Sequence, residues 1–240
     1  MSCALCQKNK PLRNSHIVPE FFYQEMYDPK NRFLGLSRIP SDRVLLYQKG
    51  LREKLLCGDC EQQFGRYESY AAQVFYGGAK LAVRWEGKRC TIGGGEYKPL
   101  KLFFLSLLWR FGVTSLPGFS GTDLGPHADR LRRMLLAEDP GGYLVYPCLV
   151  TVVTWKGKQV GELIFGPSAC KTEGRHLWHF FVAGFIFTFF VSSHLPPVSA
   201  FPGFLQPSGS LIIEVHEFTE IDFLKRIAHE IVGAQKARAG

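Results

Sequence analysis

The sequence predicts an α+β protein in two parts, a small cysteine-bearing module over residues 1–78 and a larger α+β domain with a mainly antiparallel sheet over residues 79–240. Four of the seven cysteines lie before residue 75, whereas most aromatic residues and the long apolar segments follow it. After Pro140–Gly142, one strand-like segment follows another, which is typical of the α+β class. With 46% hydrophobic and 21% charged residues, the chain can bury a core, so wholesale disorder and fibrous classes are excluded.

The elements predicted for the module are short. In chain order they are an extended stretch at Leu12–Ile17, a helix at Glu20–Tyr27, a strand at Leu51–Leu56 and a longer helix from Asp59 onward. Pro19 permits the first helix to start, and Phe64 and Tyr67 recur at helical spacing in the second. Residues 28–50 contain Pro and Gly as breakers and are expected to be irregular. We place the domain boundary near Gly77–Lys88 and expect each part to have its own core.

In the larger domain, strands outnumber helices. The predicted helices are Lys101–Phe111, Ala128–Ala137 and Glu217–Gln235, and the predicted strands are two within Val83–Ile92, then Tyr143–Trp155, Gln159–Phe165, a pair within Leu177–Ser192, and Ser210–Val215. The pair is nearly all apolar, but its about 16 residues fall short of the about 20 that span a bilayer. Its Phe, Val and Ile content favours a buried hairpin that bends at Gly184. Because no secretory signal is visible either, we expect a cytoplasmic protein without a membrane partner.

The charge pattern gives a mild preference for a polyanionic partner. The chain has 29 Lys and Arg against 21 Asp and Glu, a net charge of +8 and a pI near 9.2. Basic residues gather between Lys80 and Arg110, and four of them are candidates for binding nucleic acid: Lys80, Arg84, Lys88 and Arg89. Such side chains would contact phosphates, and a solvated basic face is the alternative. We therefore expect nucleic acid, with DNA favoured, as a partner.

Two cysteine pairs form the strongest functional pattern. Cys3 and Cys6 lie in CALC, and Cys57 and Cys60 lie in CGDC about 50 residues later. Two thiolates separated by two residues can chelate one ion from a single turn, and two such turns complete the tetrahedral shell of a structural zinc. The spacing therefore predicts one structural Zn²⁺, with two unrelated buried or redox-active pairs as the alternative. Three further cysteines share no ligand spacing and are expected to be core or surface thiols: Cys90, Cys148 and Cys170.

A histidine and two glutamates accompany the cysteine pairs. His16 follows the first pair by ten residues, Glu61 directly follows the second pair, and Glu68 lies seven residues further along the same helix face. A carboxylate that holds a hard divalent ion and an imidazole that deprotonates a water molecule together suit hydrolysis. We expect His16 to lie near Glu61, because zinc would hold the strand that carries His16 against the start of the helix. Glu68 and Ser15 are second-tier candidates.

These residues resemble the zinc-containing branch of the HNH endonucleases, which have a ββα-metal, treble-clef fold. The resemblance rests on Ser15–Phe21 (SHIVPEF) and Leu55–Glu61 (LLCGDCE), and it extends over residues 1 to about 70. It implies a zinc-bound treble-clef module at the N-terminus that hydrolyses phosphodiester bonds of nucleic acid. In the family's site, His16 would take the place of the general base, and Glu61 would help to hold a catalytic Mg²⁺ or Mn²⁺.

Two positions depart from the family pattern. The family usually has Asp or His directly before the base, as a metal ligand, and this sequence has Ser15, a poorer ligand for a hard cation. The family's later Asn or His is Glu61 here, which binds such ions well. Structural roles are the alternatives: Ser15 could be an N-cap, His16 a core-edge histidine, Glu61 a complement to the helix dipole and Glu68 a solvated residue.

The sequence leaves three functions open. The first is a metal-dependent HNH-like endonuclease. The second is a catalytically silent, zinc-stabilised module that binds nucleic acid or protein, which Ser15 favours. In the third, the apolar C-terminal domain forms a homo-oligomer or protein interface.

Overall fold

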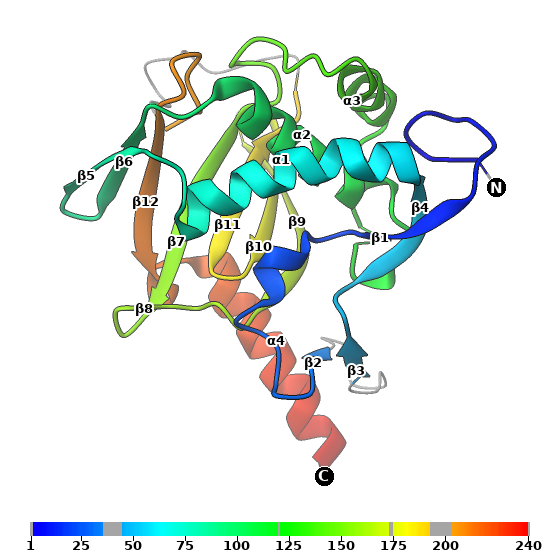
Figure 1. Ribbon diagram of the computed structural model, residues 1–240. Coiled ribbons are helices and arrows are strands. Elements are labelled where there is room, and N and C mark those ends of the chain that lie inside the picture. The colour runs from blue at the N-terminus through cyan, green and yellow to red at the C-terminus, as the bar shows by residue number, and fades with distance from the viewer. Residues whose placement is uncertain (1, 36–44, 120, 173–174, 193–202, 240) are drawn as a thin grey trace.

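An eight-stranded sheet is the centre of the computed structural model, which describes residues 2–35, 45–119, 121–172, 175–192 and 203–239 (Figure 1). Its strand order is β5-β6-β12-β7-β11-β10-β9, with β8 paired to β7. The strands are β5 (Ala82–Glu86), β6 (Arg89–Gly93), β7 (Cys148–Trp155), β8 (Lys158–Gln159), β9 (Ile164–Thr172), β10 (Arg175–Val182), β11 (Phe185–Phe190) and β12 (Leu211–Glu217). Every pairing is antiparallel except that of β12 with β7. The α+β class with a mainly antiparallel sheet is thereby confirmed.

Helices cover both faces of this sheet. The described α-helices are α1 (Gly58–Tyr76), α2 (Tyr97–Val113), α3 (His127–Leu136) and α4 (Asp222–Ala239), and short 3-10 turns are η1 (Glu20–Tyr23), η2 (Pro117–Phe119) and η4 (Phe218–Glu220). On one face, Phe104 of α2 packs on Phe187 of β11, with ring centroids 6.1 Å apart. On the other face, Leu224 of α4 joins Phe181 and Ile186 in a separate cluster. All six residues of β11 are buried because both of its faces are covered.

The apolar stretch around residues 177–192 is a buried hairpin, as predicted. β10 and β11 pair from Leu177 with Phe190 to Val182 with Phe185. The two residues between them, Ala183 and Gly184, both have positive φ angles, of 48° and 80°. Two positive φ angles are the signature of a tight turn whose twist matches that of antiparallel strands. Among the residues that the structure describes, no helix has the length and apolar character to cross a membrane.

The N-terminal part contains two small strand pairs. β1 (Leu12–His16) pairs antiparallel with β4 (Arg52–Cys57), and α1 follows β4 without a break. β2 (Arg32–Gly35) pairs with β3 (Leu45–Gln48), so the expectation of irregular structure is wrong for these residues, whereas residues 36–44 lie outside the described part. The helix expected at Glu20–Tyr27 is the four-residue turn η1, and the strand expected at Gln159–Phe165 divides between β8 and the start of β9.

One continuous core joins the two parts of the chain, which corrects the expectation of two separate cores. The largest cluster of buried residues runs from Cys3 to Ile213 and includes side chains from both parts. α2 makes the connection, because Trp109 packs edge-on against Phe64 of α1, with ring centroids 6.0 Å apart. Twelve residues of α2, from Leu100 to Phe111, are buried. A small module has too little apolar surface for a core of its own, and α2 supplies the missing surface. The boundary near residue 78 stays a prediction about the chain's organisation.

Candidate functional site

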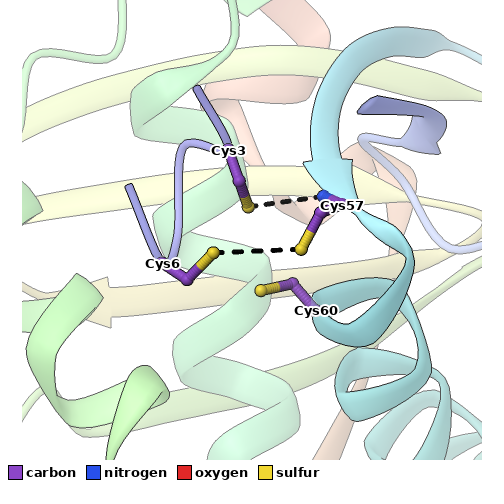
Figure 2. A group of neighbouring side chains, drawn as sticks. All are labelled: Cys3, Cys6, Cys57 and Cys60. Atoms are coloured by element: carbon purple, nitrogen blue, oxygen red, sulfur yellow. Dashed lines mark hydrogen bonds between the residues drawn. The ribbon is translucent and has the colours of Figure 1, made fainter. Parts of the chain in front are cut away.

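The four cysteines of the two pairs lie together at one end of α1 (Figure 2). Cys3 and Cys6 come from a loop that a bridge between Ser2 and Asn9 closes, Cys57 ends β4, and Cys60 lies in the first turn of α1. Their sulfur atoms all lie within 4.8 Å of one another, and those of Cys6 and Cys57 are 3.8 Å apart. Zn–S bonds of about 2.3 Å in a tetrahedron place the sulfurs about 3.8 Å apart. None of these four cysteines forms a disulfide, and their cluster could hold a zinc ion.

Burial and backbone hydrogen bonds act in opposite directions on these thiols. Burial alone would raise the pKa of Cys3, but the backbone N–H groups of Cys6, Cys57 and Leu5 donate hydrogen bonds to its sulfur and bring its pKa down to about 7. Burial, followed by the neighbouring thiols, raises the pKa of Cys60. Four adjacent thiolates repel one another unless a cation lies between them, and binding of such a cation releases their protons. The donor set and its geometry therefore fit Zn²⁺.

His16 lies at the far end of β1, opposite Arg52 of β4. Its buried Nε2 atom is 2.5 Å from Oε2 of Glu20, which is an ion-pair contact when the imidazole carries a proton. Arg52 approaches the same carboxylate at 3.6 Å. Burial, together with the positive charge of Arg52, lowers the pKa of His16, although Glu20 and Glu68 act against them. The imidazole is therefore neutral at neutral pH, which is the form that accepts a proton.

A buried arginine of α2 brings Glu68 into the group around His16. Nη1 of Arg110 donates to Oε1 of Glu68 at 2.6 Å and to the backbone carbonyl oxygen of His16 at 3.0 Å. Arg110 is 2% exposed, and its guanidinium also lies over the ring of Phe64. From the sequence, Arg110 was considered only as the last of the basic residues between Lys80 and Arg110. A charged side chain inside the apolar segment Lys101–Phe111 is the signal that could have identified it as a buried ionic partner.

Glu61 lies nearer the cysteine cluster than His16 does. β1 and α1 both lead away from this cluster in the same direction (Figure 1). From Leu12, opposite Cys57, to His16 the strand advances about 13 Å. A helix advances about 1.5 Å per residue, so the level of His16 is reached near residue 67, not near Glu61. Accordingly, Glu68 and not Glu61 is among the charged groups that act most on the pKa of His16.

The remaining roles of Glu61 and Ser15 differ. Oε1 of Glu61 is buried and has no hydrogen-bond partner, and its role as a metal ligand stays a prediction. Ser15 is 1% exposed, and its Oγ accepts a hydrogen bond from the backbone N–H of Leu56 at 3.0 Å. The hydroxyl of Ser15 therefore holds β1 against β4, and it is neither an N-cap nor directed to solvent.

A cavity of about 290 Å³ lies on the strand pair beside His16. Its lining comes from three segments: Asn14, Tyr47, Gln48, Lys49, Gly50, Leu51, Arg52 and Leu116. A Cβ atom added to Gly50 would lie 3.2 Å from the imidazole of His16, so His16 lies directly behind the part of the cavity wall that Gly50 forms. Nε of Arg52 is buried there without a hydrogen-bond partner. Arg52 thus has a buried nitrogen atom without a hydrogen-bond partner, on the strand paired with the one that carries His16 and next to a hollow.

Three of the four basic candidates for nucleic-acid binding are paired with carboxylates. The ion pairs are Arg84 with Glu86 at 2.8 Å, Lys88 with Glu220 at 2.7 Å and Arg89 with Glu214 at 2.9 Å. Lys80 is exposed just before β5. The hairpin of β5 and β6 therefore has less free positive charge than the sequence predicts, and its binding of nucleic acid stays a prediction.

Neither the protein-family models, nor the curated proteins, nor the solved structures provide a significant match to the chain.

Proposed function

We propose that this protein is a metal-dependent endonuclease of the HNH type, which hydrolyses phosphodiester bonds of nucleic acid with His16 as general base. The observation that carries the proposal is the group of His16, Glu20 and Arg52 at the cavity: Nε2 of His16 lies 2.5 Å from Oε2 of Glu20, and Nε of Arg52, a residue that lines the cavity, is buried without a hydrogen-bond partner. Arg52 is suited to bind a phosphate oxygen, and guanidinium groups recognise phosphate through directed hydrogen bonds.

The zinc ion has a structural part in this proposal. Held by the four cysteines, it would fix the N-terminal loop and β4 to the first turn of α1. The antiparallel pair β1 and β4, followed directly by α1, has the element order of the ββα-metal, treble-clef fold. This order supports placing the module in that fold, with His16 at the end of its first strand.

The chemistry requires a base and a charge that stabilises the phosphate. The neutral imidazole of His16 would take a proton from the attacking water, and Arg52 would balance the negative charge that develops. Mg²⁺ or Mn²⁺ would supply Lewis acidity at the phosphoryl oxygen. The resemblance assigns this ion to Glu61, and Glu20 and Glu68 are the carboxylates near His16 in this structure.

A catalytically silent, zinc-stabilised binding module is the second candidate function. Ser15 favours it, because its hydroxyl is committed to Leu56 and the position before His16 supplies no carboxylate or imidazole to a metal ion. DNA is the favoured ligand in both cases. A homo-oligomer or partner interface on the C-terminal domain belongs to the same proposal. So does a cytoplasmic location, because zinc-binding thiols must stay reduced.

The test uses the full-length, zinc-loaded protein with supercoiled DNA, single-stranded DNA and RNA, in Mg²⁺ or Mn²⁺. We expect cleavage that His16→Gln reduces by about 10² or more, the usual contribution of a general base, with zinc content unchanged. His229→Gln is the matched control, because His229 is exposed on α4, and it should cleave like the wild type. Absence of metal-dependent cleavage by the wild type would refute the enzyme, and retained nucleic-acid binding would then identify the second function.

A further inference from the structure

Three side chains form a row across the sheet, on the face that α4 covers. They are Cys170 of β9, His179 of β10 and Thr188 of β11. His179 lies opposite Thr188, and its partner on β9 is Ser168, two residues before Cys170, so all three side chains point to the same face. Thr188 is buried, His179 is half-buried and Cys170 is exposed on the edge strand. The row thus leads from the interior to the surface.

The imidazole of His179 is held on three sides. Its Nδ1 is 2.9 Å from Oγ1 of Thr188, and its Nε2 is 3.2 Å from Sγ of Cys170. The ring of Phe223, at the start of α4, stacks on it with centroids 5.4 Å apart. A neutral imidazole has one N–H donor and one acceptor nitrogen. When Nδ1 donates to Thr188, the lone pair of Nε2 is left to accept the thiol hydrogen of Cys170.

This geometry matches an activated nucleophile. A nucleophilic side chain, a base within hydrogen-bond reach and a third group that orients the base are the three required parts. Burial lowers the pKa of His179 and raises that of Cys170, and no charged side chain is among the causes of either shift. Both groups are therefore neutral at rest, and the proton would move as the sulfur attacks.

We propose that Cys170 is a nucleophilic thiol with His179 as its base, and that it undergoes thiol–disulfide exchange with low-molecular-weight disulfides. The Cys170 sulfur attacks one sulfur of the disulfide, and the S–H proton passes to Nε2 of His179. The S–S bond of the reagent breaks, its leaving thiolate takes the proton from His179, and Cys170 is left in a mixed disulfide. Cys170 is oxidised and the reagent is reduced to one thiol, so atoms and electrons balance.

A small reagent suits the place better than a large substrate. The cavities described in this structure are lined by residues of β5, β6 and β12 and by residues around Arg52, and neither includes Cys170. The Cys170 sulfur is exposed on an edge strand, so a small disulfide can reach it without a binding cavity, and His179 supplies the base. The other two cysteines outside the zinc cluster, Cys90 and Cys148, are buried. The proposal does not depend on the nuclease function.

The experiment follows the reaction of the full-length, zinc-loaded protein with glutathione disulfide and with 5,5′-dithiobis(2-nitrobenzoate) at neutral pH. Intact mass and peptide mapping identify the modified cysteine. One residue should react ahead of the others, and Cys170→Ser should remove this phase while the buried-thiol control Cys90→Ser keeps it. His179→Gln should slow the phase at least about tenfold, and Thr188→Val, which removes the orienting oxygen but nearly preserves shape, should slow it several-fold.

Two results would overturn the proposal. One is a fast phase that persists in Cys170→Ser. The other is a Cys170 rate in folded His179→Gln and folded Thr188→Val that equals the wild-type rate, because an exposed thiol without a base would behave in that way. Circular dichroism establishes whether each variant is folded. If His179→Gln is unfolded, the rate of Cys170 in Thr188→Val decides the outcome.

Discussion

Replacing Arg110 with Met should destabilise the protein strongly. This residue connects α2 to α1 through an ion pair and to β1 through a hydrogen bond. The guanidinium is 2% exposed and donates to Glu68 and to the carbonyl oxygen of His16. Removing one member of a buried ion pair typically costs 3–5 kcal/mol, since the remaining charge loses its partner. Because the side chain of Glu68 is 22% exposed, water can replace part of the contact, and we expect about 3 kcal/mol.

A matched surface pair provides the control. Arg66 of α1 pairs with Glu138 at 2.8 Å, and their side chains are 60% and 39% exposed. Exposed pairs of this kind contribute about 0–1 kcal/mol, so Arg66→Met should change stability little. For a chain of this size, about 3 kcal/mol lowers the melting temperature by about 6–12 °C. Thermal and urea unfolding of zinc-loaded protein, followed by circular dichroism, measure both variants.

The comparison can refute the assignment directly. If Arg110→Met and Arg66→Met lose the same stability within error, Arg110 is not a buried ionic contact. Glu68→Gln should also be destabilising, and the double variant should lose less than the sum of the single variants, because neighbouring partners are not additive.

Two further predictions concern the cysteine cluster and a buried lysine. Cys57→Ser should abolish stoichiometric zinc binding and expose residues 1–60 to proteolysis, since metal binding and folding are coupled; elemental analysis that still finds one zinc per chain would contradict this. Lys101 is 2% exposed, and burial lowers its pKa from 10.5 to about 8. Between these values the unfolded chain binds more protons than the folded one, so this residue's contribution to stability is complete above pH 10.5 and is lost as pH falls through 8. The unfolding free energy of the wild type minus that of Lys101→Met should therefore rise by about 2–3 kcal/mol from pH 7 to pH 10, and a difference independent of pH would show that Lys101 is not desolvated.

The sequence predicts the cysteine cluster better than the group around His16, for a physical reason. Each cysteine pair lies within a single turn and is visible in the sequence as a local motif. The cluster forms as soon as these two turns come into contact. The partner of His16 depends on how far a strand and a helix each advance per residue from that point. Because the strand advances more than twice as far, Glu68 and not Glu61 comes level with His16.

Long-range pairing explains most of the other differences. The hairpin of β2 and β3 was not predicted, because its strands have four residues each and periodicity is weak over so short a length. The row of Cys170 and His179 depends on strand register, which spacing along the chain does not give. The single core depends on α2, whose apolar sequence shows that it is buried but not which elements it packs against. Strands that follow one another in sequence, such as β10 and β11, were predicted well.

The position of β12 in the sheet has a consequence for biosynthesis. This strand lies between β6 and β7, so it is the link between the β5–β6 hairpin and the rest of the sheet. While the chain emerges from the ribosome, the edge of β6 that later pairs with β12 stays open until residues 211–217 are available. Open strand edges are where nascent chains pair with one another. A ribosome-stalled chain that ends before Leu211 should therefore engage chaperones more than one that ends after α4.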